Sequence, residues 1–419
     1  MRDLDGELHP VLRRLRASEP VSWLPVLGGW LVTRRDLAQR VLRDSQTFTV
    51  DDPRFSTARV VGPSMLSLDG AEHKRHRDPF ADGLRLTEVQ ARLEEFTEAE
   101  AGRLVSGFAD AGQAELRRGL AGPLAVAVVA EVLGLGDTDP QVFLSWYDEI
   151  VGAVSALAGE SGQGGGHGMG TAQPGPGHGQ QRTARGSEAF GQLKESLEAV
   201  MALGDEGSLI AAVAGRGRRE SSEGGRGAER GDGGGLEGGE VVSNAAVMAF
   251  GGIETTEGMI CNAVLHLLSD PGQLAEVIAN HGLAANAVEE SLRLEPAAAV
   301  VDRYATADVS LGGARIRRGD FVSVSLAGAG RDPAFFPDPD RFDVHRPNAR
   351  QHLAFAHGPH FCLGAHLARL EARAAMLALL RLPGLRLDGS RSAGARGIVF
   401  RKPPELHVRW DVPGDGSFR

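Results

Sequence analysis

Hydrophobic positions recur at helical spacing over much of the chain. Between Leu93 and Phe108, apolar side chains return every three or four residues among Glu and Arg, which predicts an amphipathic helix. From Leu120 to Leu135 nearly every position is apolar or Ala, a pattern typical of a fully buried helix. Further helical patterns span residues 35–42, 141–157, 187–203, 240–268, 271–294 and 363–380.

Strand-like patterns are confined to three places. Residues 21–32 predict a short strand pair that turns near Gly28 and Gly29, and residues 300–325 alternate between apolar and polar positions with turns between them. Residues 385–410 predict further short strands. Because helical patterns dominate and no repeat or boundary divides the core, we expect one domain over residues 1–419, mainly α with small β-sheets.

Two Gly-rich segments interrupt these patterns. Residues 158–186 combine Gly with His, Gln and Pro, and residues 215–239 combine Gly with Arg and Glu. Such compositions bury too little apolar surface to offset the entropy lost on ordering. Both segments are therefore predicted to be disordered loops, the second one just before the long helical pattern at 240–268.

Composition narrows the class of protein. Hydrophobic residues make up 42% of the 419 positions, enough for a large core, and the net charge of −10 argues against a general nucleic-acid binder. Two cysteines cannot form a disulfide framework and fit a reducing compartment. The N-terminus has no apolar signal region, and no stretch of about 20 apolar residues occurs. We therefore expect a cytoplasmic protein without a membrane anchor.

The two cysteines stand in different contexts. Cys261 lies within a helical pattern and is predicted to be a core residue. Cys362 lies just before a helix, whose N–H groups stabilise a thiolate, and a thiolate is an electron-donating ligand for haem iron. Gly358 and Gly364 bracket it and permit unusual backbone or close approach of a flat ligand, and His360 can donate to a carboxylate. The alternative for Cys362 is an ordinary buried thiol.

The spacing around Cys362 resembles a known signature. Phe355, Gly358, His360, Cys362 and Gly364 match every fixed position of F-x-x-G-x-H-x-C-x-G, the haem-binding pattern of the cytochrome P450 family. The chain resembles the soluble bacterial type from about residue 20 to residue 410, outside the Gly-rich segments. The resemblance implies the cytochrome P450 fold, with haem b between the long central helix and the cysteine loop. It also implies that Cys362 ligates the iron and that Phe355, His360 and Gly364 contact the cofactor.

The long helical pattern at 240–268 contains a second motif, Gly251-Gly252-Ile253-Glu254-Thr255-Thr256. Gly and Thr are poor choices for a helix interior, so the motif indicates either a kink for packing or a functional opening. The family resemblance implies that Gly251 and Gly252 leave space for O2. It further implies that Thr255 donates a hydrogen bond during oxygen activation and that Glu254 relays protons.

Charged pairs at helical spacing complete the resemblance. His73 and Arg77 alone are typical of a basic helix face, but they match the family's H-x-x-x-R element, whose side chains contact the haem propionates. Arg303 falls where the family often has another propionate ligand. Glu290 and Arg293 match the E-x-x-R element, a structural ion pair for which Arg341 is the expected third member.

The resemblance also implies a substrate pocket and electron donors. We expect the pocket to be formed by Met65, Leu66, Met248, Ala299, Val300, Ile398, Val399 and Phe400, and their apolar character favours a small or medium organic substrate. Electrons from NAD(P)H would arrive through a ferredoxin reductase and a ferredoxin at a monomeric enzyme. An acidic ferredoxin would dock on a basic face predicted to include Lys74, Arg75, His366, Arg369 and Arg373.

The favoured function is therefore a haem-thiolate monooxygenase that hydroxylates, epoxidises or couples an organic substrate in bacterial secondary metabolism. Two alternatives remain open. A non-catalytic haem-thiolate binding or recruitment module would not need the acid and the hydroxyl of Glu254 and Thr255, which are both present. A peroxygenase driven by H2O2 would favour a pocket Arg in place of that pair, and no such Arg stands on the central helix.

Overall fold

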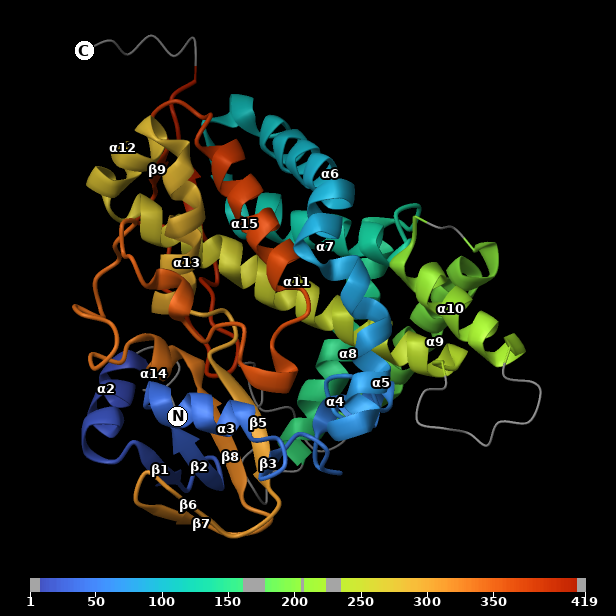
Figure 1. Cartoon of the computed structure of the whole chain (residues 1–419). Helices are drawn as coiled ribbons and strands as arrows, with labels where there is room; N and C mark the ends of the chain where they lie inside the picture. The colour runs from blue at the N-terminus through green and yellow to red at the C-terminus, as the bar shows by residue number, and fades with distance from the viewer. Residues whose placement is uncertain (1–7, 161–177, 205–206, 224–234, 413–419) are drawn as a thin grey trace, which may run out of the picture.

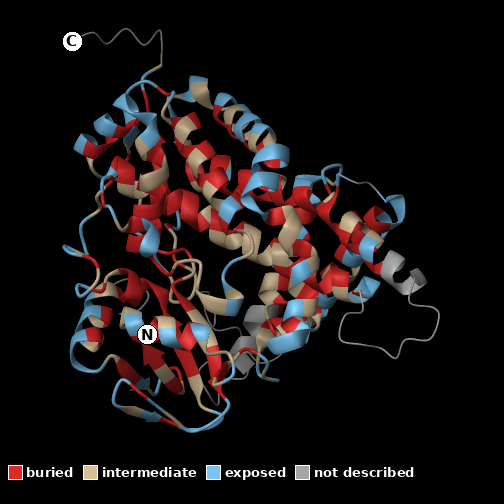
Figure 2. Ribbon diagram, viewed as in Figure 1, coloured by how far each residue is buried: buried red, intermediate tan, exposed pale blue. Residues whose placement is uncertain are grey.

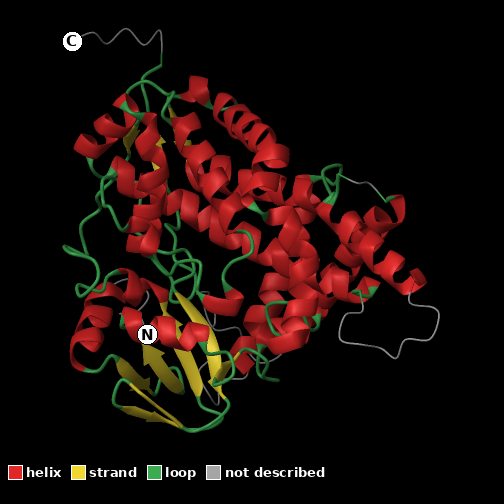
Figure 3. Cartoon of the chain, in the orientation of Figure 1, coloured by secondary structure: helices red, strands yellow, loops and turns green. Residues whose placement is uncertain are grey.

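The computed structural model describes residues 8–160, 178–204, 207–223 and 235–412, which fold mainly into helices, with the largest sheet at one end (Figures 1 and 3). The α-helices are α2 (Leu8–Ser18), α3 (Arg35–Arg43), α4 (Ser56–Val61), α5 (Gly70–Ala81), α6 (Leu86–Ser106), α7 (Gly122–Leu133), α8 (Pro140–Glu160), α9 (His178–Leu203), α10 (Leu209–Glu223), α11 (Gly238–Leu268), α12 (Pro271–Ala279), α13 (Ala284–Leu294), α14 (Leu326–Gly330) and α15 (Ala365–Leu379). The prediction of a mainly α chain with small β-sheets is confirmed.

The strands form three small sheets. The strands are β1 (Val21–Leu24), β2 (Gly29–Val32), β3 (Phe48–Thr49), β4 (Gln113–Glu115), β5 (Val300–Ala305), β6 (Val309–Leu311), β7 (Ala314–Ile316), β8 (Phe321–Ser325), β9 (Arg386–Leu387) and β10 (His407–Arg409). The largest sheet has the order β1-β2-β8-β5-β3, the second β4-β10-β9, and the third pairs β6 with β7. The predicted hairpin is confirmed, since Val21 pairs with Val32 in an antiparallel register.

Helix α11 forms the centre of the helical region. It packs against α7, α13 and α15, and Figure 2 shows that buried residues run along these elements. Its start is set by a capping box, in which the side chains of Glu237 and Glu240 each accept a hydrogen bond from the backbone N–H of the other residue. A second apolar cluster joins α3 to the largest sheet. The long helix therefore crosses the main core and can present side chains to a cavity inside it.

Several element boundaries differ from the predictions. The helix predicted over 271–294 is two helices, because the chain breaks at Asn280, whose side chain accepts from the N–H of Gly282. Short helices α4 and α14 occupy segments without a clear helical pattern. Tertiary packing of short apolar segments, which a local pattern cannot report, accounts for such differences.

The flanks of the two predicted loops are helical. Within 158–186, helix α8 continues to Glu160 and α9 begins at His178; within 215–239, α10 continues to Glu223 and α11 begins at Gly238. Helices α8 and α9 pack against each other, which supports helical turns that poor intrinsic propensity would not sustain alone. Residues 161–177 and 224–234, the centres of the two predicted loops, lie outside the described residues. In the described part of the chain, no helix is both long and apolar enough to span a lipid bilayer.

Candidate active site

A largely apolar cavity of about 290 Å³ separates α11 from the loop that carries Cys362. Helix α11 contributes Gly251 and Thr255, and the loop contributes Phe355 and Cys362. The residues that line the cavity are Met65, Leu66, Arg77, Leu84, Val129, Val132, Leu133, Val247, Met248, Gly251, Gly252, Thr255, Thr256, Met259, Leu292, Ala297, Ala298, Val301, Leu326, Ala354, Phe355, Ala356, His360, Phe361, Cys362, Leu363, Gly364, Leu367, Ala368 and Glu371. Two segments about a hundred residues apart in sequence thus face one another across it.

The loop before Cys362 is shaped by an unusual backbone. Ala356 and Gly358 have φ angles of +58° and +74°, in the left-handed region. A Cβ atom on Gly358 would lie 2.5 Å from the backbone oxygen of Leu42 in α3, so this position requires Gly. The Cys362 N–H donates to the carbonyl of Phe355 at 2.9 Å, which closes the loop. The loop therefore packs against α3 and presents Cys362 just before α15.

Gly364 serves another purpose than Gly358. Its φ of −82° is open to any residue, so the sequence argument for strained backbone does not apply here. A Cβ atom on Gly364 would meet no other atom within 4 Å, although the residue lines the cavity. The missing side chain therefore leaves space beside Cys362.

The two cysteines differ as predicted. Cys261 is 1% exposed within α11, which confirms it as a core residue, and burial raises the pKa of its thiol. Cys362 lines the cavity, where its side chain remains accessible. Burial raises the pKa of Cys362, while the N–H of Gly364 and the charges of Arg77 and Arg369 lower it in part. Gly364, Arg77 and Arg369 therefore favour the thiolate form of Cys362, which is the form that binds a metal ion.

The Gly-Thr motif of α11 faces the same cavity. The hydroxyl of Thr255 donates to the carbonyl of Gly251 at 2.5 Å, one turn earlier on the helix. A Cβ atom on Gly251 would meet nothing within 4 Å, so this Gly keeps cavity space open. A Cβ atom on Gly252 would lie 2.6 Å from the side chain of Val129 in α7. Gly252 therefore permits close packing of α11 against α7. Gly251 is not constrained by such a contact, and its missing side chain leaves space in the cavity.

Glu254, next to Thr255, is directed away from the cavity lining. Its Oε2 accepts from the hydroxyl of Tyr147 in α8 at 2.8 Å, and its Oε1 lies 2.8 Å from the Nζ of Lys402. Lys402 also lies 3.1 Å from Glu257, which pairs with Arg117. Burial and the negative charge of Glu254 raise the pKa of Tyr147. In this conformation the carboxylate is held in an ion-pair cluster beside α8.

A cluster of basic side chains lies beside the cavity. Arg77 and His360 line it, and the ring of His73 lies 4.3 Å from that of His360. Burial, together with the positive neighbours His360 and Arg77, lowers the pKa of His73 to about 4. Arg303 on β5 is 4% exposed and donates to the carbonyl of Asp302. The four basic residues predicted to bind propionates therefore form one cluster, with His73 and Arg303 behind the lining.

This cluster fits a cofactor that carries carboxylates. The Nε2 atom of His73 is buried without a hydrogen-bond partner in the described structure, which is costly for a polar atom unless a ligand completes it. The side chain of Arg303 carries a buried positive charge for which a bound carboxylate is the natural partner. The cavity between α11 and Cys362 is apolar elsewhere, as a macrocycle requires. The residues present therefore suit haem.

The structural ion pair behind the cavity differs in one member. Arg293 donates from Nε to Glu290 at 2.7 Å, and both side chains are fully buried. The third member is Arg346, whose Nε donates to Glu290 at 2.8 Å. The prediction of Arg341 is wrong: its side chain is exposed, and only its backbone carbonyl accepts from Arg293 and Arg346. The error arose because two arginines lie five residues apart in the same loop, and sequence alone does not show which one turns inward.

The residues predicted for the substrate pocket lie only partly along the cavity. Met65, Leu66 and Met248 line the cavity, but the five others do not: Ala299, Val300, Ile398, Val399 and Phe400. Ala299 and Val300 instead pack in an apolar cluster against α2. The missed lining residues from the same stretch are Ala297, Ala298 and Val301. Alternate residues of an extended chain face opposite sides, so a small error in register moves the prediction out of the cavity.

The predicted basic face is largely paired within the chain. Four of its five side chains have a carboxylate partner: Lys74 with Asp78, Arg75 with Glu240, Arg369 with Glu289 and Arg373 with Glu94. Burial would raise the pKa of Glu289, but the hydrogen bonds and charges of His352 and Arg369 outweigh it and lower that pKa to about 2. These residues therefore form a charge-balanced surface rather than a strongly positive one.

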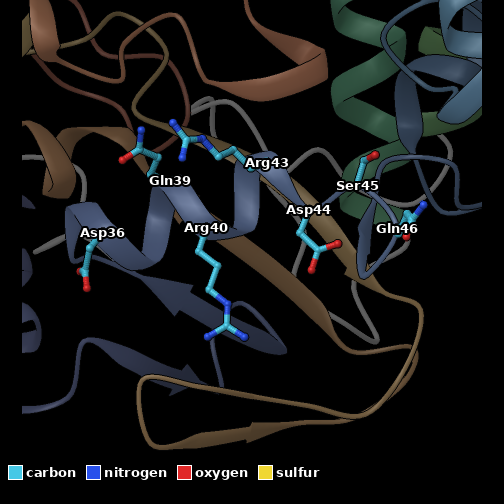
Figure 4. A pocket seen from close by; sticks show the side chains of 7 residues that line it. All are labelled: Asp36, Gln39, Arg40, Arg43, Asp44, Ser45 and Gln46. Carbon is cyan, nitrogen blue, oxygen red and sulfur yellow. The ribbon is translucent and has the colours of Figure 1, made fainter.

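A separate surface hollow lies on α3, next to the cysteine loop. It is lined by Asp36, Gln39, Arg40, Arg43, Asp44, Ser45 and Gln46. Figure 4 shows Gln39 and Arg43 on one side of the helix and Asp36 and Arg40 on the other, so the side chains do not converge. Arg43 donates to His357 of the cysteine loop at 2.6 Å. The residues of the hollow carry charges of both signs, and Arg43 links α3 to the cysteine loop.

The cavity lining also contains a carboxyl group that was not predicted from the sequence. Glu371 on α15 is 1% exposed, and its Oε2 has no hydrogen-bond partner in the described structure. Burial raises the pKa of this carboxyl well above its usual range, so it is neutral over a wider pH range than an exposed Glu. The available signal was its position nine residues after Cys362, on a helix that is otherwise apolar on that face.

The fold and the site together define a haem-thiolate protein, and comparisons with known proteins agree. The family model described as Cytochrome P450 matches residues 224–382. The cytochrome P450 monooxygenase PikC of Streptomyces venezuelae is 35% identical over 98% of this chain and 92% of its own length. The mycinamicin IV hydroxylase/epoxidase of Micromonospora griseorubida is 32% identical, with 94% of each chain covered. The crystal structure of CalO2 superposes with a TM-score of 0.83 at 28% identity, covering 97% of both chains.

The chain belongs to the cytochrome P450 family. It has the fold that was expected, and it is a monooxygenase that uses haem, O2 and electrons from redox partners to oxidise a small-molecule substrate. Haem, when bound, supplies the oxygen-activating chemistry.

Proposed function

We propose that this protein is a bacterial tailoring oxygenase that hydroxylates, epoxidises or couples an apolar, medium-sized secondary metabolite. The observation that carries the proposal is the cavity, in which apolar side chains face Thr255 and Gly251 on one side and Cys362 on the other. An apolar wall excludes water and favours a substrate of low polarity. Relatives include an enzyme named for the hydroxylation and epoxidation of mycinamicin IV, which supports a substrate of that metabolic origin.

The proposed roles of the site residues follow from their contacts. Cys362 would ligate the iron of haem b, Phe355 and Gly364 would lie against the macrocycle, and His73, Arg77, Arg303 and His360 would hold its propionates. Thr255 would use its hydroxyl, now bonded to Gly251, to hold a proton beside bound O2. Glu254 would serve as a proton relay after leaving Tyr147 or Lys402, because its carboxylate does not line the cavity.

The electron donors are proposed to be a ferredoxin and its NAD(P)H-dependent reductase, acting on a monomeric enzyme in the cytoplasm. The free thiols of Cys261 and Cys362 suit a reducing compartment.

Substrate titration of the purified ferric holoenzyme tests the proposal. A panel of free metabolites, with simple fatty acids and aromatic compounds as controls, is titrated while the Soret band is recorded. We expect a low-spin to high-spin shift with members of the metabolite class, because an apolar ligand displaces water from the iron side of the cavity. A shift with fatty acids or simple aromatics alone would contradict the proposed substrate class.

Product analysis then tests whether a compound that binds is also oxidised. Turnover with a surrogate ferredoxin, its reductase and NADPH should convert the compound that shifts the spectrum into an oxygenated product. Conversion with H2O2 alone at an equal rate would instead indicate a peroxygenase. Absence of product with a compound that binds and shifts the spectrum would contradict the assignment of that compound as the substrate.

A further inference from the structure

Asp69 stands at the start of α5 but does not cap the helix. Asp is a preferred N-cap residue because its carboxylate accepts hydrogen bonds from the first free backbone N–H groups. Asp69 directly precedes Gly70 and has the extended backbone of an N-cap, with φ −125° and ψ 170°. Its side chain nevertheless makes no capping hydrogen bond. The carboxylate is therefore engaged with other groups.

These groups belong to two other segments that meet behind the cavity. The Oδ2 atom of Asp69 accepts from the hydroxyl of Thr49 at 2.7 Å and from the backbone N–H of Val50 at 2.9 Å. The Oδ1 atom lies 2.8 Å from the Nε2 of His360. Asp69 thus joins the end of β3, the start of α5 and the cysteine loop.

The contact between Asp69 and His360 is shielded from solvent. The side chains are 14% and 8% exposed, so water weakens their attraction less than it weakens a surface pair. Burial alone would raise the pKa of Asp69, but the hydrogen bonds from His360, Thr49 and Val50 outweigh it and the net shift is downward. Asp69 therefore carries a negative charge at neutral pH.

That charge lies among the residues that suit the carboxylates of the cofactor. His360 lines the cavity, and its ring contacts that of His73 at a tilt. Arg303 lies close enough to Asp69 for each charge to act on the other. Asp69 brings a carboxylate into direct contact with His360 of this basic cluster. A fixed negative charge near a redox cofactor disfavours the addition of an electron.

We propose that Asp69 is a positioning residue for the haem, which holds the ring of His360 in place at the propionate end and keeps one negative charge beside the cofactor. Asp69 acts through His360 and does not itself line the cavity. The inference concerns how the cofactor is held and how readily it is reduced. It is independent of which substrate the enzyme oxidises.

The first test compares two carboxylate-to-amide variants of the holoenzyme, Asp69→Asn and Glu72→Gln. Glu72 lies on α5, pairs with Arg75 and is 58% exposed, so it controls for the loss of one charge from this part of the chain. Two quantities are measured without turnover: the rate of haem transfer to excess apomyoglobin, and the midpoint reduction potential. For Asp69→Asn we expect haem transfer about tenfold faster, the loss expected for one shielded hydrogen bond to a charged group. We also expect a higher potential, while Glu72→Gln stays at the parent values.

A second variant separates orientation from charge. Thr49→Val removes the hydroxyl that holds Oδ2 but leaves the carboxylate of Asp69 in place. We expect haem transfer about threefold faster, as for one weaker neutral hydrogen bond, with the potential close to that of the parent. A conserved potential together with faster haem loss would show that the hydroxyl acts on geometry.

The outcomes that overturn the proposal are distinct. If Asp69→Asn equals Glu72→Gln in both measurements, Asp69 has no role toward the haem. If Asp69→Asn does not retain haem well enough to measure, Thr49→Val decides, and a parent-like rate of haem transfer in that variant overturns the positioning role. Neither measurement involves substrate, so failure here leaves the substrate proposal untouched.

Discussion

The cavity is bordered by a basic cluster and by an apolar lining, and the sequence encodes the two differently. In the basic cluster, His73 and Arg77 lie one helical turn apart, and His360 lies two residues before Cys362. The apolar lining comes from separate segments, among them Met248 on α11 and Val301 on β5. Short motifs therefore specify the basic cluster, whereas the apolar lining is assembled from positions that share no motif.

The physical reason lies in what each kind of contact demands. A buried cation needs a partner at a particular distance and angle, so only a few residue types at a fixed spacing satisfy it. An apolar wall needs only volume and the exclusion of water, and many side chains satisfy both. A motif search therefore finds the basic cluster and misses much of the apolar lining.

The largest effect is expected in the charged framework behind the cavity. Arg346→Leu removes a buried partner of Glu290 and leaves that carboxylate short of one donor, which should cost about 3–5 kcal/mol of unfolding free energy. Arg341→Leu, on an exposed side chain, should change it by less than about 0.5 kcal/mol. Urea unfolding followed by circular dichroism measures both. Equal losses in the two variants would contradict the assignment of Arg346.

A second effect concerns Glu371, the one carboxyl among the described residues that line the cavity. Its pKa is raised in the folded state, so the stability that its neutral form contributes is full below the unfolded value of 4.5 and is lost as pH rises through the folded value. Glu371→Gln cannot ionise. Its stability relative to the parent should therefore increase as pH rises from about 5 to about 8, by about 2 kcal/mol at most.

Thermal unfolding of the holoenzyme across this pH range measures the change. Glu98→Gln, which alters a half-exposed carboxylate on α6, is the matched control and should show no such trend. A difference between Glu371→Gln and the parent that is independent of pH would show that the carboxyl does not titrate differently in the folded protein.

A third effect separates Thr255 from the apolar residues beside it. Thr255→Ala removes the hydroxyl and should reduce product formed per NADPH consumed about tenfold, the value of one hydrogen bond, with little change in substrate affinity. Thr255→Ser keeps the hydroxyl and should restore most of the coupling. Parallel assays of product, NADPH and H2O2 measure it. Unchanged coupling in the Ala variant would remove Thr255 from the proposed proton path.

The smallest effect tests the corrected apolar wall. Val301→Ala removes two methyl groups from the cavity lining and should weaken substrate binding about fivefold. Ile398→Ala, at a predicted position that does not line the cavity, should leave the affinity unchanged. Spectral titration with the same ligand measures both. A larger loss for Ile398 than for Val301 would restore the original pocket prediction.

Much of the fold was predictable because its causes are local. The periodicity of residues 240–268 and the all-apolar stretch 120–135 each correspond to a helix, and the apolar pattern around Gly28 corresponds to the hairpin of β1 and β2. The division of 271–294 at Asn280 was missed, since one polar residue that bonds to its own loop interrupts the helix without altering the apolar pattern.

The sequence by itself specified the loop that places Cys362 at the cavity, because the spacing of Gly358, His360 and Cys362 is local to that loop. Only the tertiary structure decided which arginine pairs with Glu290, where Glu254 points, and that Glu371 enters the cavity without a partner. Each of these outcomes depends on segments far apart in the chain that approach during packing. A local pattern specifies which residues can interact, but the packed fold selects the ones that do.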